Sequence, residues 1–148
     1  LLDSSIRTGN SMADAILNSK VSLAKAREID VRVDAHIPVK LKISEIDLCC
    51  ILGNLFDNAI DASMALPPQN RLIRVYMDMK GSRLYISFTN FTSQKKLGKL
   101  GRVFATTKGL GHGLGLSRIE TIVEKHDGYL SFNSEDGAFT AEILLPQE

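Results

Sequence analysis

The chain has 148 residues, of which 44% are hydrophobic and 24% are charged, and its formal net charge at pH 7 is +1. This composition is that of one ordinary globular domain and argues against a disordered chain. The small net charge gives no reason to expect a nucleic-acid or anionic-membrane partner, and no apolar run approaches the roughly 20 residues that a membrane-spanning helix needs.

The first part of the chain predicts two helices with a strand between them. The segment NSMADAILNSKVSLAKARE has apolar residues at roughly helical spacing, which predicts a helix that ends near residue 28. The apolar stripe expected on this helix consists of Met12, Ala15, Ile16, Leu23 and Ala26. Residues 29–37 alternate in polarity like a half-buried strand. Ser44 then caps a helix expected to run to about Met64, where two prolines follow.

The second part predicts two β-hairpins separated by a long loop and a helix. Residues 71–80 and 83–90 alternate in polarity around Gly81-Ser82, which is a hairpin signal. Residues 91–112 are polar, rich in Lys and Gly, and aperiodic, and a loop that long in a compact domain is more often a functional lid than a connector. A helix from about Leu114 to Lys125 and a final hairpin around Asp136-Gly137 complete the chain.

The order of these elements predicts the fold class. Strands that arrive in adjacent pairs favour a mixed, largely antiparallel sheet with helices layered on one face. We therefore expect an α/β (α+β) two-layer sandwich. The sequence shows no internal repeat and no second domain, so residues 1–148 are expected to form a single domain in which residues 91–112 are the lid.

Four glycines at alternate positions stand in the segment TTKGLGHGLGLSRIE, directly before the last predicted helix. The segment fits neither a dinucleotide-binding fingerprint nor a P-loop, because the required third glycine and the GK[ST] sequence are absent. Glycine-rich backbone at a helix N-terminus offers free N–H groups and the positive end of the helix dipole, both of which suit a phosphate. Lys108 adds a cation there. A flexible loop before a helix explains this stretch equally well.

The helix predicted to begin at Ser44 carries two stripes. Its core-facing apolar stripe consists of Leu48, Leu52, Leu55, Ala59 and Ala62. Its second stripe consists of short polar residues, Asn54, Asp57, Asn58 and Asp61. Asn and Asp are poor helix formers in helix interiors, and four short oxygen-bearing side chains in register suit a hard cation such as Mg²⁺ together with substrate phosphates. A merely exposed polar face is the alternative.

Together, the polar stripe, the long loop and the glycine-rich segment describe a magnesium-nucleotide pocket. NLFDNAIDA resembles the N box, and GHGLGL the last glycine box, of the GHKL ATP-binding fold. That group includes gyrase-type topoisomerases, Hsp90-type chaperones, mismatch-repair ATPases and histidine kinases. The resemblance spans about Ser44 to Pro146. The segments around RTGN and TTKG make the chain most similar to the sensor kinases of Gram-positive peptide-pheromone quorum sensing.

The resemblance implies roles for the residues at matching positions. Asn58 matches the asparagine that binds Mg²⁺, and Asn54 matches the position that holds a catalytic glutamate in hydrolysing members. Without a carboxylate there, nothing obvious activates water, which favours a kinase over a hydrolase. Thr107 and Lys108 are expected near the phosphates, where Lys108 would stabilise the transferring phosphoryl group. The residues that match the phosphate-wrapping segment are Gly111, Gly113, Leu114, Gly115 and Leu116.

The middle glycine box departs from the family pattern. Most members carry Asp-x-Gly-x-Gly after this strand, and the aspartate bonds the adenine amino group, whereas ISFTNFTSQ offers Asn90 and no glycine. The side-chain oxygen of Asn90 could accept a hydrogen bond from the adenine amine, but without a negative charge. The resemblance therefore implies a weaker nucleotide affinity and a less certain adenine selectivity than usual.

None of the three histidines is a convincing phosphoacceptor. His36 lies at a strand end, and His112 lies inside the glycine segment, where it either helps to hold phosphate or is simply exposed. His126 falls in the last helical turn, where it is expected to favour the helix dipole. Because the sequence begins at Leu1 and not at Met, we expect the acceptor on an absent upstream dimerisation domain, joined through residues 1–28.

The sequence thus predicts the catalytic domain of a sensor histidine kinase that binds Mg-ATP and donates its γ-phosphoryl group to the upstream histidine. A response regulator is expected as an indirect partner, and the segment is expected to be a cytoplasmic part of a membrane-anchored sensor. The adjacent residues Cys49 and Cys50 fit this as core residues in a reducing compartment. Two alternatives stay open: an anti-sigma-type serine kinase of the same fold, and a docking domain whose degenerate pocket has lost nucleotide.

Overall fold

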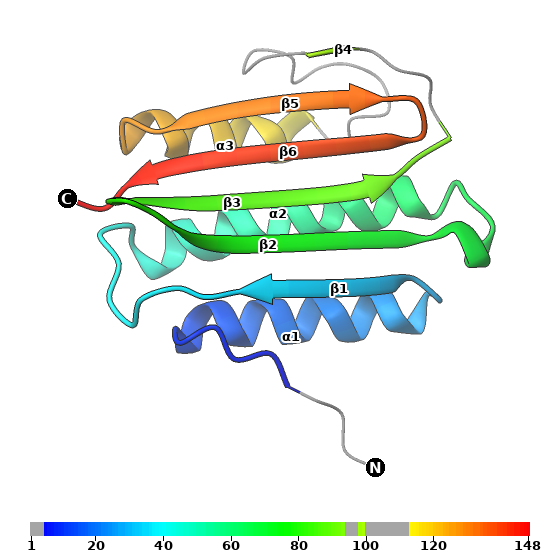
Figure 1. The fold of residues 1–148 in the computed structure, drawn as a ribbon, viewed down its shortest axis with the longest axis horizontal. Coiled ribbons are helices and arrows are strands. Elements are labelled where there is room, and N and C mark those ends of the chain that lie inside the picture. The colour runs from blue at the N-terminus through cyan, green and yellow to red at the C-terminus, as the bar shows by residue number, and fades with distance from the viewer. Residues whose placement is uncertain (1–4, 94–97, 100–112) are drawn as a thin grey trace.

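The protein was examined as a computed structural model, which describes residues 5–93, 98–99 and 113–148. Three helices lie on one face of a single sheet, with α2 between α1 and α3 (Figure 1). The elements in chain order are α1 (Ser11–Ala26), β1 (Asp30–Ala35), α2 (Glu45–Ser63), the 3₁₀ turn η1 (Pro68–Asn70), β2 (Leu72–Lys80), β3 (Arg83–Phe91), β4 (Gly98–Lys99), α3 (Gly113–Lys125), β5 (Tyr129–Glu135) and β6 (Ala138–Pro146).

The sheet has the strand order β1-β2-β3-β6-β5-β4. β1 pairs with β2 in parallel, and every other neighbouring pair is antiparallel. Both predicted hairpins are present: Gly81 turns β2 into β3 with a φ of 63°, and Gly137 turns β5 into β6 with a φ of 82°. Glycine adopts such positive φ values without a Cβ clash. The predicted mixed, largely antiparallel sheet and the two-layer α/β sandwich are confirmed.

The helices begin where the sequence provides a capping side chain. Ser44 Oγ accepts a hydrogen bond of 3.1 Å from the backbone N–H of Asp47, as expected for the cap of α2. Asn10 plays the same part for α1, because its Oδ1 accepts from the N–H of Ala13 at 3.1 Å. These caps satisfy backbone donors that have no partner inside the helix.

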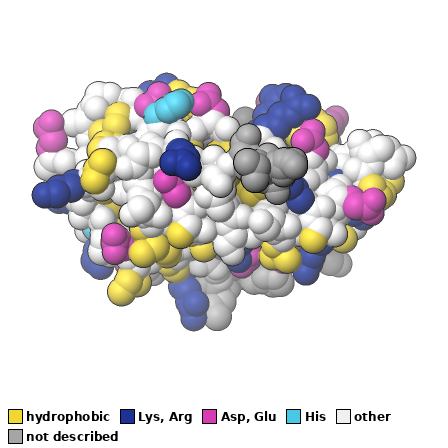
Figure 2. Space-filling view, turned by 90° about the horizontal axis from the view of Figure 1, so that it is seen from below, with side chains coloured by type: hydrophobic (Ala, Val, Ile, Leu, Met, Phe, Trp, Pro, Cys, Tyr) yellow, Lys and Arg dark blue, Asp and Glu magenta, His cyan; other side chains and the backbone are white. Residues whose placement is uncertain are grey.

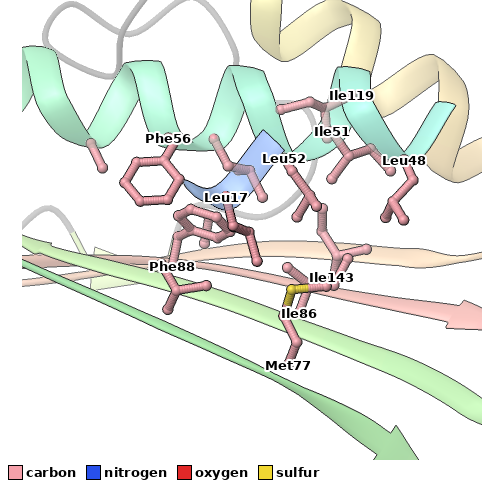
Figure 3. Packing of buried hydrophobic residues seen from close by; sticks show 14 of the residues in the cluster. Leu17, Leu48, Ile51, Leu52, Phe56, Met77, Ile86, Phe88, Ile119 and Ile143 are labelled. Carbon is pink, nitrogen blue, oxygen red and sulfur yellow. The ribbon is translucent and has the colours of Figure 1, made fainter. Parts of the chain in front are cut away.

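The core is one apolar cluster between the three helices and the sheet (Figure 3). Phe56 of α2 meets Phe88 of β3 edge to face, with ring centroids 5.2 Å apart. Burial of each such side chain contributes about 1.5–3 kcal/mol. On the face drawn in Figure 2, which is the edge of the molecule at α1 and β1, acidic and basic side chains of the described residues are interspersed.

The predicted apolar stripe of α1 is wrong in part. The fully buried residues of α1 are Ala13, Leu17 and Ala24. Of the predicted stripe, Ala15 and Ala26 are exposed and Leu23 is 40% exposed, while Ile16 packs partly against the core. The helix has more apolar positions than one face can bury, and the face carrying small alanines allows α1 to approach α2 closely. Residues 11–26 therefore belong to the core of this domain.

Two further expectations need correction. The apolar face of α2 is broader than predicted, because this helix is flanked by α1, α3 and the sheet (Figure 1). Its buried residues also include Ile51, Phe56, Ile60 and Ser63, whereas Ala62 is only half-buried. The segment 91–112 is not wholly irregular, since Gly98–Lys99 forms β4 and pairs with β5. The rest of the predicted lid, beyond residue 93, lies outside the described residues.

Candidate functional site: a cavity between the middle helix and the sheet

A cavity lies between α2 and the sheet and contains about 480 Å³ of empty space, part of which is open to solvent. Its walls are mostly apolar, and the rings of Phe132 and Phe139 stack there with centroids 5.7 Å apart. An apolar pocket with a few polar groups is the usual form of a small-molecule site. The lining residues are Leu55, Asn58, Ala59, Ala62, Phe88, Asn90, Thr92, Leu116, Phe132, Phe139 and Ala141.

Asn58 is the polar residue that α2 contributes to this cavity. It lies one helical turn from Leu55 and from Ala62, which line the same cavity. Its side chain is half-buried and makes no hydrogen bond with the residues that the structure describes. Both its amide oxygen and its amide nitrogen therefore remain available to a ligand.

Asn90 faces the same cavity from β3 and is only 5% exposed. Its Nδ2 donates a hydrogen bond of 3.0 Å to the carbonyl oxygen of Phe91. Because the amide nitrogen is used in this way, the side-chain oxygen is the group left to accept a hydrogen bond from a ligand. Asn58 and Asn90 therefore line the same cavity from α2 and from β3.

Asn54 lies beside the first turn of α3. Its Nδ2 donates to the carbonyl oxygen of Cys50 at 2.8 Å. A Cβ atom placed on Gly115 would lie 2.7 Å from Asn54 Oδ1, which is closer than real Cβ atoms come to such atoms. A side chain at residue 115 would therefore displace the Asn54 amide, and the packing of α3 on α2 here places Leu116 in the cavity wall.

The two aspartates of the predicted polar stripe do not line the cavity. Asp57 instead forms an ion pair with Lys20 of α1, with Nζ and Oδ1 2.6 Å apart. Asp61 is exposed. The stripe of four residues therefore divides, because the 100° step of a helix turns Asp57 away from Asn58. Among the described residues, no group of three or more His, Cys, Asp or Glu side chains could hold a metal ion.

Several predicted site residues fall on the undescribed part of the chain. Thr107, Lys108, Gly111 and His112 lie outside the described residues. Gly113 and Leu114 form the start of α3, as the glycine-box prediction requires for a helix N-terminus.

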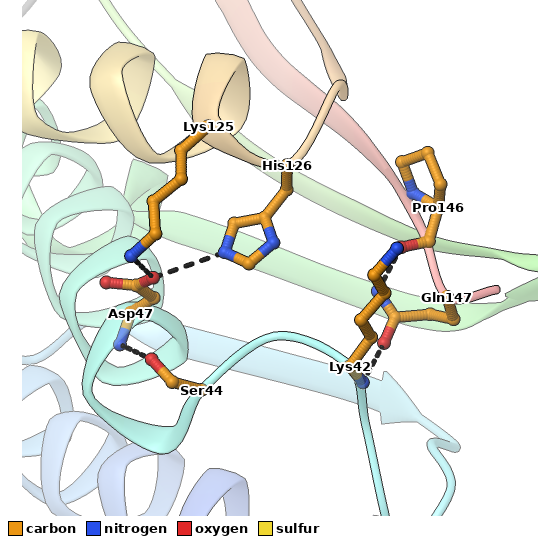
Figure 4. Close-up of polar contacts among 7 residues, drawn as sticks. All are labelled: Lys42, Ser44, Asp47, Lys125, His126, Pro146 and Gln147. Carbon is orange, nitrogen blue, oxygen red and sulfur yellow. Dashed lines mark hydrogen bonds and ion pairs between the residues drawn. The ribbon is translucent and has the colours of Figure 1, made fainter.

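His126 follows α3 and contacts the first turn of α2 (Figure 4). Its Nε2 lies 3.2 Å from Asp47 Oδ2, and Lys125 Nζ lies 2.9 Å from the same oxygen. These two hydrogen bonds hold the pKa of Asp47 below its ordinary value of 3.8. The His126 side chain is 12% exposed, so it is a structural partner of Asp47 in addition to its expected place at the helix end.

Sequence reasoning missed the cavity residues that the last hairpin supplies. Phe132 and Phe139 come from β5 and β6, far along the chain from Asn58. The available signal was the alternation of β5, in which Leu130 and Phe132 point to the same face. Lys20 was also missed, because nothing in the spacing of α1 indicates an acidic partner 37 residues later.

A mixed sheet covered on one face by three helices, with a cavity between the middle helix and the sheet, defines a two-layer α/β sandwich. Residues 43–146 match the family model described as GHKL domain. The chain therefore belongs to the GHKL domain family, and the resemblance found in its two motifs is confirmed at that level.

Sensor kinases are among the relatives of this chain. It is 28% identical over 147 residues to a "Probable C4-dicarboxylate sensor kinase" of Halalkalibacterium halodurans, covering 94% of this chain and 28% of the relative. It is 32% identical over 128 residues to the "Sensor histidine kinase ZraS" of Escherichia coli K12, covering 83% and 27%. The chain thus spans little more than a quarter of the length of these relatives.

Solved structures share the fold. The catalytic domain of histidine kinase ThkA superposes with a TM-score of 0.72 at 21% identity, covering 95% of this chain and 93% of that one. A mycobacterial sensor histidine kinase, MprB, gives 0.68 at 18% identity, with coverages of 90% and 93%. None of the helices in the described ranges is long and apolar enough to cross a membrane.

Proposed function

We propose that this chain is the ATP-binding catalytic domain of a sensor histidine kinase, which binds Mg-ATP and donates the γ-phosphoryl group to a histidine of another domain. The observation that carries the proposal is the cavity of a GHKL domain in which two asparagines, Asn58 and Asn90, retain hydrogen-bonding capacity. The sensor-kinase names of several relatives support it.

The cavity suits the adenine base. Its walls contribute aromatic and aliphatic surface for a flat heterocycle, and Asn90 Oδ1 is left to accept a hydrogen bond. The 6-amino group of adenine is a donor, whereas the corresponding oxygen of guanine is an acceptor that would meet another acceptor. We infer that Asn90 favours adenine through a neutral hydrogen bond, which contributes about 0.5–1.5 kcal/mol.

We assign the metal and the phosphates to the side of α2 that carries Asn58, next to the start of α3. Asn58 offers an amide oxygen, which Mg²⁺ accepts together with phosphate oxygens and water. When bound, the ion neutralises charge on the phosphates. The N-terminus of α3 would hold the phosphates through its backbone N–H groups, with Thr107, Lys108, Gly111 and His112 as further predicted contacts.

The residue at the position of the hydrolytic base supports transfer over hydrolysis. Asn54 is a neutral amide whose nitrogen is bonded to the Cys50 carbonyl oxygen. An amide cannot take the proton of an attacking water, so the γ-phosphoryl group is kept for another acceptor. Among the described histidines, His126 is engaged by Asp47 and His36 is an exposed neighbour of Asp34, which leaves neither near the cavity.

The partners and location follow from this role and belong to the proposal. The acceptor histidine would lie on an upstream dimerisation domain joined through residues 1–28, and a response regulator would receive the phosphoryl group afterwards. The domain would lie on the cytoplasmic side of a membrane-anchored sensor. The resemblance of the RTGN and TTKG segments favours a peptide-pheromone sensor of the quorum-sensing type.

Calorimetry with ATP, in the presence and absence of Mg²⁺, tests the proposal. The chain is expected to bind with a Mg²⁺-dependent heat that Asn58→Ala removes. Asn133→Ala is the matched control, because Asn133 is exposed on β5 and does not line the cavity. Absence of binding at millimolar ATP would contradict the proposal and favour a docking domain. Transfer of radiolabel to a supplied histidine hairpin separates a histidine kinase from a serine kinase.

A further inference from the structure

Residues 6–10 form a tightly bonded segment, here called the N-terminal strap, that the nucleotide site does not use. Asn18 of α1 accepts from the N–H of Ile6 at 2.8 Å and donates to the carbonyl oxygen of the same residue at 3.1 Å. Asp14 Oδ1 accepts from both the N–H and the Oγ1 of Thr8, at 2.7 and 2.6 Å. Two side chains of α1 therefore hold the backbone of the strap.

The strap is also fixed to the loop that follows β1. The N–H of Ile37 donates to the carbonyl oxygen of Thr8 at 2.9 Å, and Asn10 Nδ2 donates to the carbonyl oxygen of Val39 at 3.1 Å. Gly9 has a φ of 105°, and a Cβ there would lie 2.6 Å from the carbonyl oxygen of Ile37. Thr8 and Asn10 are buried polar residues. Residues 6–10 therefore have a defined position against α1 and the loop after β1.

Two residues beyond Asn18, α1 forms an ion pair with α2. Lys20 Nζ lies 2.6 Å from Asp57 Oδ1, and the Lys20 side chain is only 20% exposed. The lysine stem lies along α2, because a Cβ on Gly53 would come within 4.0 Å of Lys20 Cε. Asp57 directly precedes Asn58 in α2. A continuous set of contacts therefore runs from the strap through α1 to the helix that carries Asn58.

We propose that Lys20 is a positioning residue of the nucleotide site, and that its pair with Asp57 couples the N-terminal strap to α2. The proposal rests on the proposed nucleotide binding. In this proposal the strap has two states. In the docked state it is bonded to Asp14 and Asn18, and in the released state these bonds are broken. Docking fixes α1 against α2. Coupling between two sites is reciprocal for binding free energies. Nucleotide binding must therefore raise the docking equilibrium constant of the strap by the same factor by which docking raises the nucleotide affinity.

Hydrogen exchange of the strap amides tests this coupling on the present chain. Saturating Mg-ADP should slow exchange of the Thr8 and Ile6 amides about two- to fivefold, the range expected for one partly exposed ion pair. In Lys20→Met the slowing should disappear, although the stem still covers Gly53. Lys25→Met is the matched control, because Lys25 is an exposed lysine of α1 that makes no ion pair with a described residue.

Two further variants test whether the strap and the nucleotide site are coupled through the Lys20–Asp57 pair. Thr8→Val should lower Mg-ADP affinity about two- to fivefold in the wild-type background and not in Lys20→Met. The double variant Lys20→Asp, Asp57→Lys restores the ion pair with reversed charges and should restore the coupling. Nucleotide binding without any change at Thr8, or an unchanged response in Lys20→Met, would overturn the coupling alone. Absence of nucleotide binding by the wild-type chain would overturn the proposed function as well.

Discussion

Two polar residues of α2, Asp47 and Asn58, use their side chains in opposite ways. In the first turn, the carboxylate of Asp47 is hydrogen-bonded to Lys125 and His126. The backbone N–H of Asp47 donates to Ser44 Oγ. About three turns further along α2, Asn58 makes no hydrogen bond with the described residues, although it lines a cavity.

The difference separates structural polar groups from groups available to a ligand. Hydrogen bonds within the protein hold Asp47 where it joins α2 to α3, so this carboxylate contributes to stability. A half-buried amide without such bonds contributes little to stability and gives up no hydrogen bond within the protein when it binds a ligand. Changes at Asp47 should therefore alter stability alone, and changes at the cavity should alter nucleotide binding.

The largest effect is expected at the contact between Gly115 of α3 and Asn54 of α2. Gly115→Val should destabilise the protein by about 2 kcal/mol, because the added side chain overlaps Asn54 Oδ1. Urea unfolding measures the change. Adding Asn54→Ala should recover part of it, and Gly53→Ala, where a Cβ has space, should be neutral or stabilising. Equal losses in the Gly115 and Gly53 variants would contradict the packing account.

A smaller effect is expected from the first half of α2. Asp47→Ala should destabilise the protein by about 1–2 kcal/mol, because it removes two charged hydrogen bonds to a mostly buried carboxylate. ATP affinity should stay within twofold of the wild-type value. Glu45→Ala is the control, since Glu45 is an exposed acidic residue of the same turn. A large loss of ATP affinity in Asp47→Ala would contradict the distinction between Asp47 and Asn58.

At the cavity, Asn90→Ala should weaken ATP binding about three- to tenfold, the value of one neutral hydrogen bond. Binding of GTP should change less, because the lost oxygen is an acceptor that guanine does not use. Competition titrations with the two nucleotides measure the ratio, with Asn133→Ala as the control. An unchanged ratio of ATP to GTP affinity would contradict the role given to Asn90.

The smallest effect is the pH dependence of the Asp47 contacts. The pKa of Asp47 is lowered in the folded protein by its hydrogen bonds to Lys125 and His126. Its contribution is therefore fully present above the ordinary value of 3.8 and is lost as the pH falls through the lower folded pKa. Urea midpoints between pH 5 and pH 2 should fall less steeply in Asp47→Ala than in the wild type. Parallel curves would contradict the assignment.

The sheet could be predicted from the sequence because strand alternation is a local pattern. The alternation of residues 71–80, the turn at Gly81 and the Ser44 cap were readable, and the structure buries Ile73, Val75 and Met77 of β2. The buried face of α1 was not, because its apolar residues occupy several faces and only the tertiary contact selects Ala13 and Leu17.

The candidate site could be predicted only where one element carries the signal. Asn58 was readable from the polar stripe of α2 and Asn90 from its strand. The division of that stripe was not, because the partner of Asp57 is Lys20 on another helix. The cavity walls depend on Phe132 and Phe139, which reach α2 only after β5 and β6 have joined the sheet.

The most direct test of the central claim is a titration of the chain with Mg-ADP, followed by the amide resonances of the backbone and of the asparagine side chains. We expect the side-chain amides of Asn58 and Asn90 to shift with a saturating curve, while the backbone amides of Asp47 and His126 do not move. Shifts confined to the Asp47 region, or no shift at either asparagine at saturating nucleotide, would contradict the assignment of this cavity as the nucleotide site.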